Sequence, residues 1–265
     1  MLNRRAAVLG QPVAHSRSPV LHTAGYAAAG LTGWAYTAIE CGTDELADLV
    51  AGLGPEWAGL SLTMPLKEVA LAVADVVDPL AAVLGAANTL VRGADGRWTA
   101  YNTDAPGMVD ALGLDAAETF AVLGGGGTAR AALGAAAQLR ASVTLYLRRP
   151  EPAEELRPVA HALGVPVVVR PWGRAPEAVS ADVVVSTVPK GAADALATAA
   201  WQPGSVVFDV VYDPWPTAVA DAAARAGSRV VSGLDLLLTQ GVRQFELFTG
   251  AHAPVDEMRQ ALSGR

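Results

Sequence analysis

Two residues of this sequence could move a proton. Lys67 closes the segment SLTMPLK, and Asp104 stands in AYNTDAPG. The chain contains only two lysines, Lys67 and Lys190. Each is a candidate for acid–base chemistry, because lysine can give up its proton near neutral pH and arginine cannot. Pro65 is predicted to open a helix that carries Lys67. Taken alone, Lys67 also fits a solvated residue of that helix, and Asp104 also fits a helix N-cap.

Hydroxyl and amide side chains accompany this pair. HSRSP contains Ser16 and Ser18 at a predicted helix start. Hydroxyls there suit a carboxylate ligand, although a capping serine is the simpler alternative. Thr63 follows a predicted strand, and Asn88 lies in AANTL. This set suits the dehydrogenation of an alcohol, in which a proton leaves the hydroxyl as hydride leaves the carbon. The chemistry needs no zinc if the lysine polarises the oxygen.

A glycine-rich segment supplies the second kind of site. TFAVL at residues 119–123 is a short apolar run, four glycines follow, and an alanine-rich helical stretch comes next. Gly124 can adopt the φ of a tight turn, and Gly126 leaves room for a pyrophosphate near the backbone. Ala129 provides the small residue that packs the helix on the strand, which completes GxGxxA. We therefore predict a dinucleotide-binding βαβ unit, with a bare structural turn as the alternative.

The end of the next predicted strand indicates which dinucleotide binds. An acidic residue at this place would bond the ribose 2′-hydroxyl of NAD, but the sequence has Arg148 and Arg149. Two guanidinium groups suit a 2′-phosphate, which favours NADP. A solvated basic strand end is the alternative.

Composition limits the classes of partner. The chain has 265 residues and a formal net charge of -7, which disfavours nucleic acid or an anionic membrane as the main partner. Cys41 is the only cysteine, so neither an intrachain disulfide nor a multi-cysteine metal site is possible, and the four histidines show no metal-ligand spacing. No signal peptide or membrane-spanning run is recognisable, so we expect a cytoplasmic protein.

The predicted elements arrange these residues in two domains. Residues 1–104 contain strands and helices of their own and form a first α/β domain, with a hairpin signal at Asp95-Gly96. From residue 119 strands and helices alternate, including a helix at 191–199, which predicts a parallel, doubly wound sheet. Helices end the chain at about 233–248 and 254–262. We expect a cleft between the two domains.

The sequence resembles the shikimate dehydrogenase family over nearly its whole length. The resemblance rests on several motifs in a specific order: GQPVAHSRSP at 10–19, SLTMPLK at 61–67, GAANTL at 85–90, YNTDAPG at 101–107, LGGGGTARA at 123–131, VSTVPKG at 185–191, FDVVYDPWPT at 208–217 and SGLDLLLTQGVRQFELFTG at 232–250. It implies the reversible reduction of 3-dehydroshikimate to shikimate with NADPH, in the chorismate pathway of aromatic amino-acid biosynthesis. It also implies that helices 233–265 complete the substrate-binding catalytic domain, and that residues 105–232 form a Rossmann-like NADP-binding domain.

The resemblance also implies roles for individual residues. Lys67 and Asp104 would be the catalytic pair. Residues that would bind the substrate are Ser16, Ser18, Thr63, Asn88, Tyr212 and Gln240. Residues that would bind the cofactor are Gly124, Gly125, Gly126, Gly127, Thr128, Ala129, Arg148, Arg149, Thr187 and Gly233. The protein would act as a monomer or a homodimer.

Three positions depart from the family pattern. Ser61 stands where the family usually has asparagine, and Arg148-Arg149-Pro150 replaces the usual Asn-Arg-Thr. Residues 233–237 read GLDLL in place of the usual Gly-x-x-Met-Leu. A quinate/shikimate or aminoshikimate dehydrogenase is a close alternative. A non-catalytic protein that binds NADP or shikimate is a more distant one, which the presence of both Lys67 and Asp104 disfavours.

Overall fold

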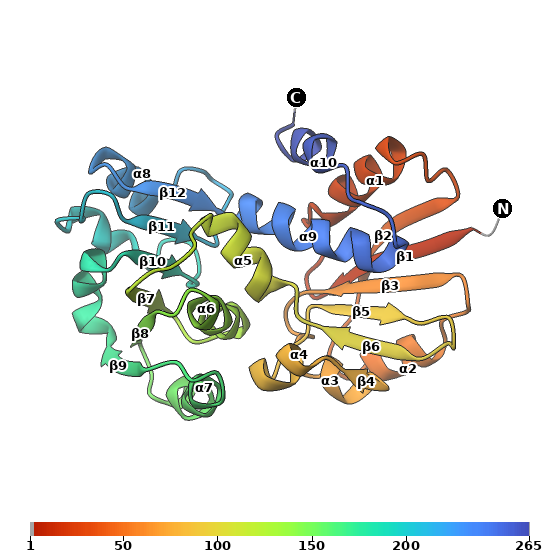
Figure 1. Ribbon diagram of the computed structural model, residues 1–265, viewed down its shortest axis with the longest axis horizontal. Helices are drawn as coiled ribbons and strands as arrows, with labels where there is room; N and C mark the ends of the chain where they lie inside the picture. Colours follow the sequence, from red (N-terminus) through yellow and green to blue (C-terminus); the bar gives the residue numbers. More distant parts are fainter. Residues whose placement is uncertain (1–2, 265) are drawn as a thin grey trace. The chain divides into compact units, whose positions relative to one another are not determined.

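The computed structural model describes residues 3–264, and the chain divides into two compact units (Figure 1). Unit 1 comprises the chain up to Asp104 together with the chain from Leu237 onward, and unit 2 comprises Ala105–Leu236. The second crossing between the units therefore lies inside helix α9 (Gly233–Thr249). The sequence analysis placed it at the start of the same helix.

Unit 1 contains a six-stranded mixed sheet of order β2-β1-β3-β5-β6-β4. β1, β2 and β3 run parallel, while β5 is antiparallel to both β3 and β6. Its strands are β1 (Arg4–Gly10), β2 (Trp34–Glu40), β3 (Trp57–Leu62), β4 (Val76–Val77), β5 (Thr89–Arg92) and β6 (Trp98–Tyr101). Its helices are α1 (Ser18–Ala28), α2 (Leu46–Ala51), α3 (Ala70–Val73), α4 (Pro79–Leu84), the later turns of α9, and α10 (Val255–Leu262).

The predicted hairpin in unit 1 is confirmed and fixes the register around the polar residues. β5 and β6 pair from Arg92 opposite Trp98 to Thr89 opposite Tyr101, and Gly96 takes a φ of +84° in the turn. β3 pairs with the other edge of β5, which sets Ser61 opposite Thr89. Two buried polar residues thus lie side by side at the centre of the sheet.

Helix α9 packs on unit 1 through aromatic side chains. Phe245 and Phe248 are buried with residues of β1, β2 and α1. A Cβ on Gly59 of β3 would lie 2.0 Å from the ring of Phe248, so only glycine allows this approach. The close packing brings the polar face of α9 against the sheet centre.

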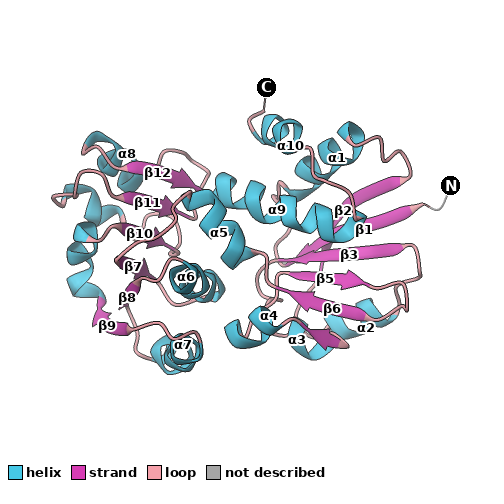
Figure 2. Ribbon diagram, viewed as in Figure 1, coloured by secondary structure: helices cyan, strands magenta, loops and turns pink. Residues whose placement is uncertain are grey.

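Unit 2 contains a six-stranded sheet of order β12-β11-β10-β7-β8-β9, and every neighbouring pair is parallel. Helices and strands alternate along this part of the chain (Figure 2). The strands are β7 (Thr119–Leu123), β8 (Ser142–Leu147), β9 (Val167–Pro171), β10 (Val183–Ser186), β11 (Val206–Asp209) and β12 (Arg229–Ser232). The helices are α5 (Asp104–Leu112), α6 (Gly127–Gln138), α7 (Glu151–Ala162) and α8 (Ala218–Arg225), with 3-10 helices η1 (Trp172–Ser180) and η2 (Asp194–Thr198).

The strand order of unit 2 is that of a dinucleotide-binding fold. β7 is central, the chain moves outward through β8 and β9, and it then returns to the other side of β7 through β10. Ligands of such sheets bind at the carboxyl ends of the strands where this reversal occurs. The predicted helix at 191–199 is wrong. Gly191 has a φ of +82°, which an α-helix cannot continue through, and a turn there leads into the short η2.

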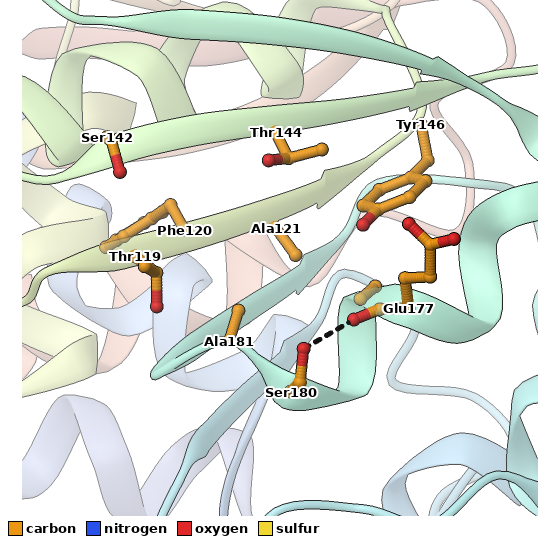
Figure 3. A pocket seen from close by; sticks show the side chains of 10 residues that line it. Thr119, Phe120, Ala121, Ser142, Thr144, Tyr146, Glu177, Ser180 and Ala181 are labelled. Carbon is orange, nitrogen blue, oxygen red and sulfur yellow. Dashed lines mark hydrogen bonds between the residues drawn. The ribbon is translucent and has the colours of Figure 1, made fainter.

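One small pocket of unit 2 lies away from this strand edge (Figure 3). It measures about 140 Å³, and Thr119 and Ser142, the first residues of β7 and β8, contribute to its lining. At one side of it, within η1, the Ser180 hydroxyl donates to the backbone carbonyl of Glu177. Because part of the lining comes from the amino ends of the strands, this pocket is not the predicted dinucleotide site.

Within residues 3–264, no helix is both long enough and apolar enough to cross a membrane. The same residues contain no group of three or more His, Cys, Asp or Glu side chains placed to hold a metal ion.

Candidate active site

The centre of the candidate site is the contact between Lys67 and Asp104. The Lys67 Nζ atom lies 2.6 Å from the Asp104 Oδ2 atom, and their side chains are 20% and 8% exposed. A buried charge is costly unless it is paired, and here each group supplies the opposite charge to the other. The partial exposure of Lys67 leaves the pair open to a ligand.

Lys67 reaches this position from a turn, not from a helix as the sequence predicted. The backbone N–H of Leu66 donates to Thr63 at 2.9 Å, and that of Ala70 donates to Leu66 at 3.0 Å, so the chain turns twice before α3 begins. The Lys67 carbonyl accepts from the N–H of Ala87 at 2.7 Å. This bond ties the lysine segment to the segment that carries Asn88.

Asn88 and Gln240 complete the group around Asp104. Asn88 lies one residue before β5, and its Nδ2 atom donates to Asp104 Oδ1 at 2.8 Å. The same nitrogen lies 3.2 Å from the Oε1 atom of Gln240 on α9. The structure therefore brings together four predicted site residues: Lys67, Asp104, Asn88 and Gln240.

Two threonines that the sequence analysis missed hold the Asn88 side chain. The backbone N–H of Thr103 donates to Asn88 Oδ1 at 2.8 Å, and the Thr89 hydroxyl donates to the same oxygen at 2.9 Å. Thr89 and Thr103 are 0% and 3% exposed. Both stand directly beside a predicted residue in the sequence, but only the fold brings Thr103 to the Asn88 side chain.

Gln244 is a third residue that the sequence analysis missed. Its Nε2 atom donates to the Asn88 carbonyl at 3.1 Å and to the Thr89 hydroxyl at 2.9 Å. It is 1% exposed. A signal for it was available, because Gln240 and Gln244 are four residues apart on one helix and must share a face.

Ser61 extends the polar group into the sheet. Its hydroxyl donates to Gln244 Oε1 at 2.7 Å and accepts from the Tyr36 hydroxyl at 2.7 Å. Burial raises the pKa of Tyr36, and hydrogen bonds with Ser61 and Ser18 oppose that rise. Ser61 stands where the family usually has asparagine. Both of its hydrogen-bond partners, Tyr36 and Gln244, are thus side chains of the protein itself.

His22 stacks on this group without joining it. Its ring lies 4.2 Å from that of Tyr36, with 4° between their planes. Among residues 3–264 no group reaches either ring nitrogen at hydrogen-bond geometry. Burial lowers the pKa of His22 to about 3, and the Gln244 side chain offsets only part of this shift. The ring is therefore neutral at ordinary pH.

The two serines of HSRSP lie at the start of α1. Ser18 is the first helical residue and not the N-cap, so α1 begins one residue earlier than predicted, and the Ser18 N–H donates to Ser16 Oγ at 3.3 Å. Ser18 is 5% exposed. Thr63 follows the end of β3 and packs on β1, where a Cβ on Gly10 would lie 2.3 Å from the Thr63 methyl group. These three residues belong to unit 1, and so do Lys67, Asn88, Asp104 and Gln240.

In unit 2 the glycine-rich turn follows β7 as predicted. Gly124 has a φ of +104°, and a Cβ there would lie 2.6 Å from the Thr187 hydroxyl. A Cβ on Gly126, the N-cap of α6, would meet nothing within 4 Å. Ala129 is 0% exposed, as close helix–strand packing requires. The arrangement leaves open space at a helix N-terminus, where phosphate groups bind.

The remaining cofactor candidates lie at the carboxyl ends of neighbouring strands. Thr187 follows β10 and donates from both its N–H and its hydroxyl to the carbonyl of Leu123, at 2.9 and 2.8 Å. Gly125, Gly127 and Thr128 complete the turn and the start of α6. Arg148 and Arg149 follow β8 and are exposed. Their exposure leaves both guanidinium groups accessible to an anionic ligand.

Tyr212 and Gly233 lie close together in unit 2. A Cβ on Gly233 would lie 2.0 Å from the carbonyl oxygen of Val210 and 2.9 Å from the Tyr212 ring. The loop with Tyr212 is held by Asp209, which accepts from the Thr217 hydroxyl at 2.8 Å and the Val211 N–H at 3.2 Å. Burial raises the pKa of Asp209, and these bonds oppose the rise. Tyr212 is the one predicted substrate residue outside unit 1.

Comparison with known proteins agrees with this geometry. The model of the shikimate dehydrogenase substrate-binding domain matches residues 8–90, and that of the shikimate 5'-dehydrogenase C-terminal domain matches residues 233–262. The model of the alanine dehydrogenase/PNT C-terminal domain matches residues 82–227.

Individual relatives match over their full length. A shikimate dehydrogenase (NADP(+)) of Moorella thermoacetica is 40% identical over 97% of this chain and 91% of its own. The crystal structure of the Mycobacterium tuberculosis shikimate dehydrogenase has a TM-score of 0.90, with 45% identity over 99% of this chain and 100% of that one. A shikimate 5-dehydrogenase of Thermus thermophilus, in complex with NADP(H) and shikimate, has a TM-score of 0.85, with 31% identity over 98% and 99% of the two chains. The chain therefore belongs to the shikimate dehydrogenase family.

Proposed function

We propose that this protein catalyses the reversible reduction of 3-dehydroshikimate to shikimate with NADPH. The observation that carries the proposal is the contact of Lys67 with Asp104, which Asn88 and Gln240 surround inside unit 1. Relatives named as NADP-dependent shikimate dehydrogenases support it, since they match the chain over nearly its whole length.

The chemistry requires one hydride and one proton. The nicotinamide ring supplies the hydride to the carbonyl carbon when the cofactor is bound. The proton must reach the carbonyl oxygen at the same time, and in the reverse direction it must leave the hydroxyl. The Lys67–Asp104 pair gives this proton to the substrate oxygen and takes it back in the reverse direction. The Lys67 ammonium also stabilises negative charge on that oxygen. Because the two groups already touch, no rearrangement is needed to bring them together.

The other residues of unit 1 bind the substrate. Hydroxyl groups of Ser16 and Ser18 at the start of α1 receive the carboxylate, where the helix N-terminus favours negative charge. Side chains with both donors and acceptors bind the ring hydroxyls, and these are Thr63, Asn88 and Gln240. Tyr212 of unit 2 is also proposed to bind the substrate carboxylate. Unit 1 is thus the proposed substrate domain.

Unit 2 is the proposed cofactor domain. The pyrophosphate lies over the turn from Gly124 to Gly127 and on the first residues of α6, Thr128 and Ala129, where Gly126 leaves open space. Arg149 bonds the 2′-phosphate and Arg148 adds charge beside it. Thr187 and Gly233 lie on the nicotinamide side. The exposed arginines at the end of β8 support NADP over NAD.

Initial rates test this proposal. Reduced-nicotinamide absorbance is followed with shikimate or quinate, each in the presence of NADP or NAD. We expect rapid turnover with shikimate and NADP and much slower turnover with the other three pairs. Faster turnover of quinate with NAD would overturn the assigned substrate and the proposal that Arg148 and Arg149 select NADP. Absence of turnover with every pair, while NADP still binds, would favour a non-catalytic binding protein.

A further inference from the structure

A continuous chain of buried side chains leads from the sheet interior to Asp104. It runs from Tyr36 through Ser61 to Gln244, and then through Thr89 and Asn88 to Asp104. Each neighbouring pair is hydrogen bonded, at distances from 2.7 to 2.9 Å. The four members from Ser61 to Asn88 are between 0% and 4% exposed. Water therefore cannot replace a missing partner without entering the core.

The backbone fixes the orientation of the amide at Asn88. The N–H of Thr103 can only donate, so the Asn88 atom 2.8 Å from it must be the carbonyl oxygen. The Asn88 nitrogen therefore faces Asp104, to which it donates at 2.8 Å. A rotation of the amide by half a turn would place two donors together at Thr103 and two acceptors together at Asp104.

The backbone also fixes the orientation of the amide at Gln244. The carbonyl of Asn88 can only accept, so the Gln244 atom 3.1 Å away is the nitrogen. The same nitrogen donates to the Thr89 hydroxyl at 2.9 Å. The Thr89 proton then points to the nearer of its two acceptors, the Asn88 oxygen at 2.9 Å, since the Thr103 hydroxyl lies 3.4 Å away. Thr89 thus transmits the orientation of Gln244 to Asn88.

Ser61 and Tyr36 hold the other end of Gln244. Gln244 Oε1 accepts from the Ser61 hydroxyl, so the Ser61 oxygen must in turn accept from Tyr36. The donors and acceptors of Tyr36, Ser61 and Gln244 are consequently matched at each contact. Such a fully satisfied network holds its members rigidly, whereas loss of one member leaves a buried group unpaired.

We propose that Thr89 and Gln244, anchored by Ser61 and Tyr36, are positioning residues that hold the Asn88 amide against Asp104 and so keep Asp104 in contact with Lys67. This inference rests on the proposed function for its kinetic consequences, but not for its structural ones. Neither Thr89 nor Gln244 touches Asp104 or Lys67 in the contacts described above. Their influence on the reaction must therefore pass through Asn88.

Thr89 permits a matched test, because its hydroxyl and its methyl group can be removed separately by two substitutions. Thr89→Val keeps the shape and removes the hydroxyl, whereas Thr89→Ser keeps the hydroxyl and removes the methyl group. Thr99→Val makes the same change on β6 outside the network and serves as the control. We expect Thr89→Val to lower kcat by about tenfold to 10²-fold, as small displacements of catalytic groups do. Thr89→Ser and Thr99→Val should keep kcat close to that of the wild type.

The kinetic result separates positioning from packing. All rates are expressed per folded molecule, and NADP affinity is measured on the same samples. A wild-type kcat for Thr89→Val would overturn the proposal, and so would an equal loss for Thr89→Ser, which would assign the effect to the methyl group. If Thr89→Val does not fold, Gln244→Met tests the next member of the chain. A wild-type kcat in Gln244→Met would also overturn the proposal.

A crystal structure of Thr89→Val makes the test independent of the substrate. We expect the Asn88 side chain to move away from Asp104, with the backbone of β5 unchanged. An Asn88 side chain that keeps its place would overturn the proposal. If the wild-type protein turns over no substrate, the proposed function fails, and this structure still decides whether Thr89 positions Asn88.

Discussion

The two units hold their functional groups in opposite ways. In unit 1 the groups are side chains, and each buried one is bonded to several partners, as Asn88 is to Thr89, Thr103 and Asp104. In unit 2 the turn after β7 provides open space, because its glycines have no side chains: a Cβ on Gly126 would meet no protein atom within 4 Å. Chemistry needs groups fixed to a fraction of an ångström, whereas a pyrophosphate needs room and backbone donors.

This contrast predicts that substitutions in the two units affect different steps. Changes around Asp104 should lower the rate at saturating cofactor. Changes in the turn of unit 2 should weaken cofactor binding and leave the rate at saturation nearly intact.

The largest effect is expected from Lys67→Ala. Loss of the proton-transfer group should lower kcat by about 10²- to 10⁴-fold, the usual contribution of acid–base catalysis. NADP affinity should stay unchanged, because the proposed site of the pyrophosphate lies in unit 2. Lys190→Ala removes the other lysine and is the control. Steady-state kinetics with shikimate measure the change, and a kcat within a factor of a few of the wild type would remove Lys67 from the chemistry.

Arg149→Ala should weaken NADP binding by about tenfold to 10²-fold, which corresponds to the loss of a charged hydrogen bond of about 1.5–3 kcal/mol. The affinity for NAD should change little, because NAD has no 2′-phosphate. Titration of each cofactor measures both affinities, and Arg157→Ala on α7 is the control. An equal loss of affinity for both cofactors would show that Arg149 does not bind the 2′-phosphate.

Gly126→Ala sharpens the contrast further. The added methyl group meets no protein atom within 4 Å, so the thermal midpoint should stay near that of the wild type. The methyl group would occupy the space proposed for the pyrophosphate, so NADP should bind about tenfold more weakly, a change of about 1.4 kcal/mol. Gly173→Ala, where a Cβ also meets nothing within 4 Å, is the control. Unchanged affinity would place the pyrophosphate elsewhere.

The last prediction concerns the stability of the protein and not its activity, and it involves His22. Its pKa falls from 6.5 to about 3 on folding, so between these values the unfolded chain binds a proton that the folded protein does not. Stability contributed by the neutral ring is present above pH 6.5 and is lost as pH falls toward 3. The slope is about 1.4 kcal/mol per pH unit. Denaturant unfolding of His22→Phe should show a shallower loss over this range, and an identical slope would mean that His22 does not titrate this way.

The sequence predicted much of the fold, and it predicted the parts that depend on local chemistry best. The hairpin at Asp95-Gly96 and the turn at Gly124 are local features, and the structure contains both. The helix expected around Lys67 is a turn, because the Lys67 carbonyl, which a helix would bond to the N–H of Leu71, accepts instead from the N–H of Ala87. Such a choice depends on packing against the rest of unit 1, which a residue pattern does not record.

The candidate residues divide in the same way. Lys67 and Asp104 could be proposed from residue types and motifs, although they stand far apart in the chain. Thr89 could not, because its importance arises from the register of β3 against β5. Gln244 could be placed on the same helix face as Gln240, but its contacts with Asn88 and Thr89 depend on the close approach of α9 at Gly59. Long-range contacts of this kind decide which ordinary polar residues hold a site in place.

The most direct test of the account is a single turnover of the wild-type protein. The protein is loaded with NADPH, excess 3-dehydroshikimate is added, and reduced-nicotinamide absorbance is followed while the product is identified by NMR. The account predicts that each bound NADPH is consumed in one fast phase and that one shikimate forms for each. Unchanged absorbance, in a sample where both ligands are shown to bind, would contradict it.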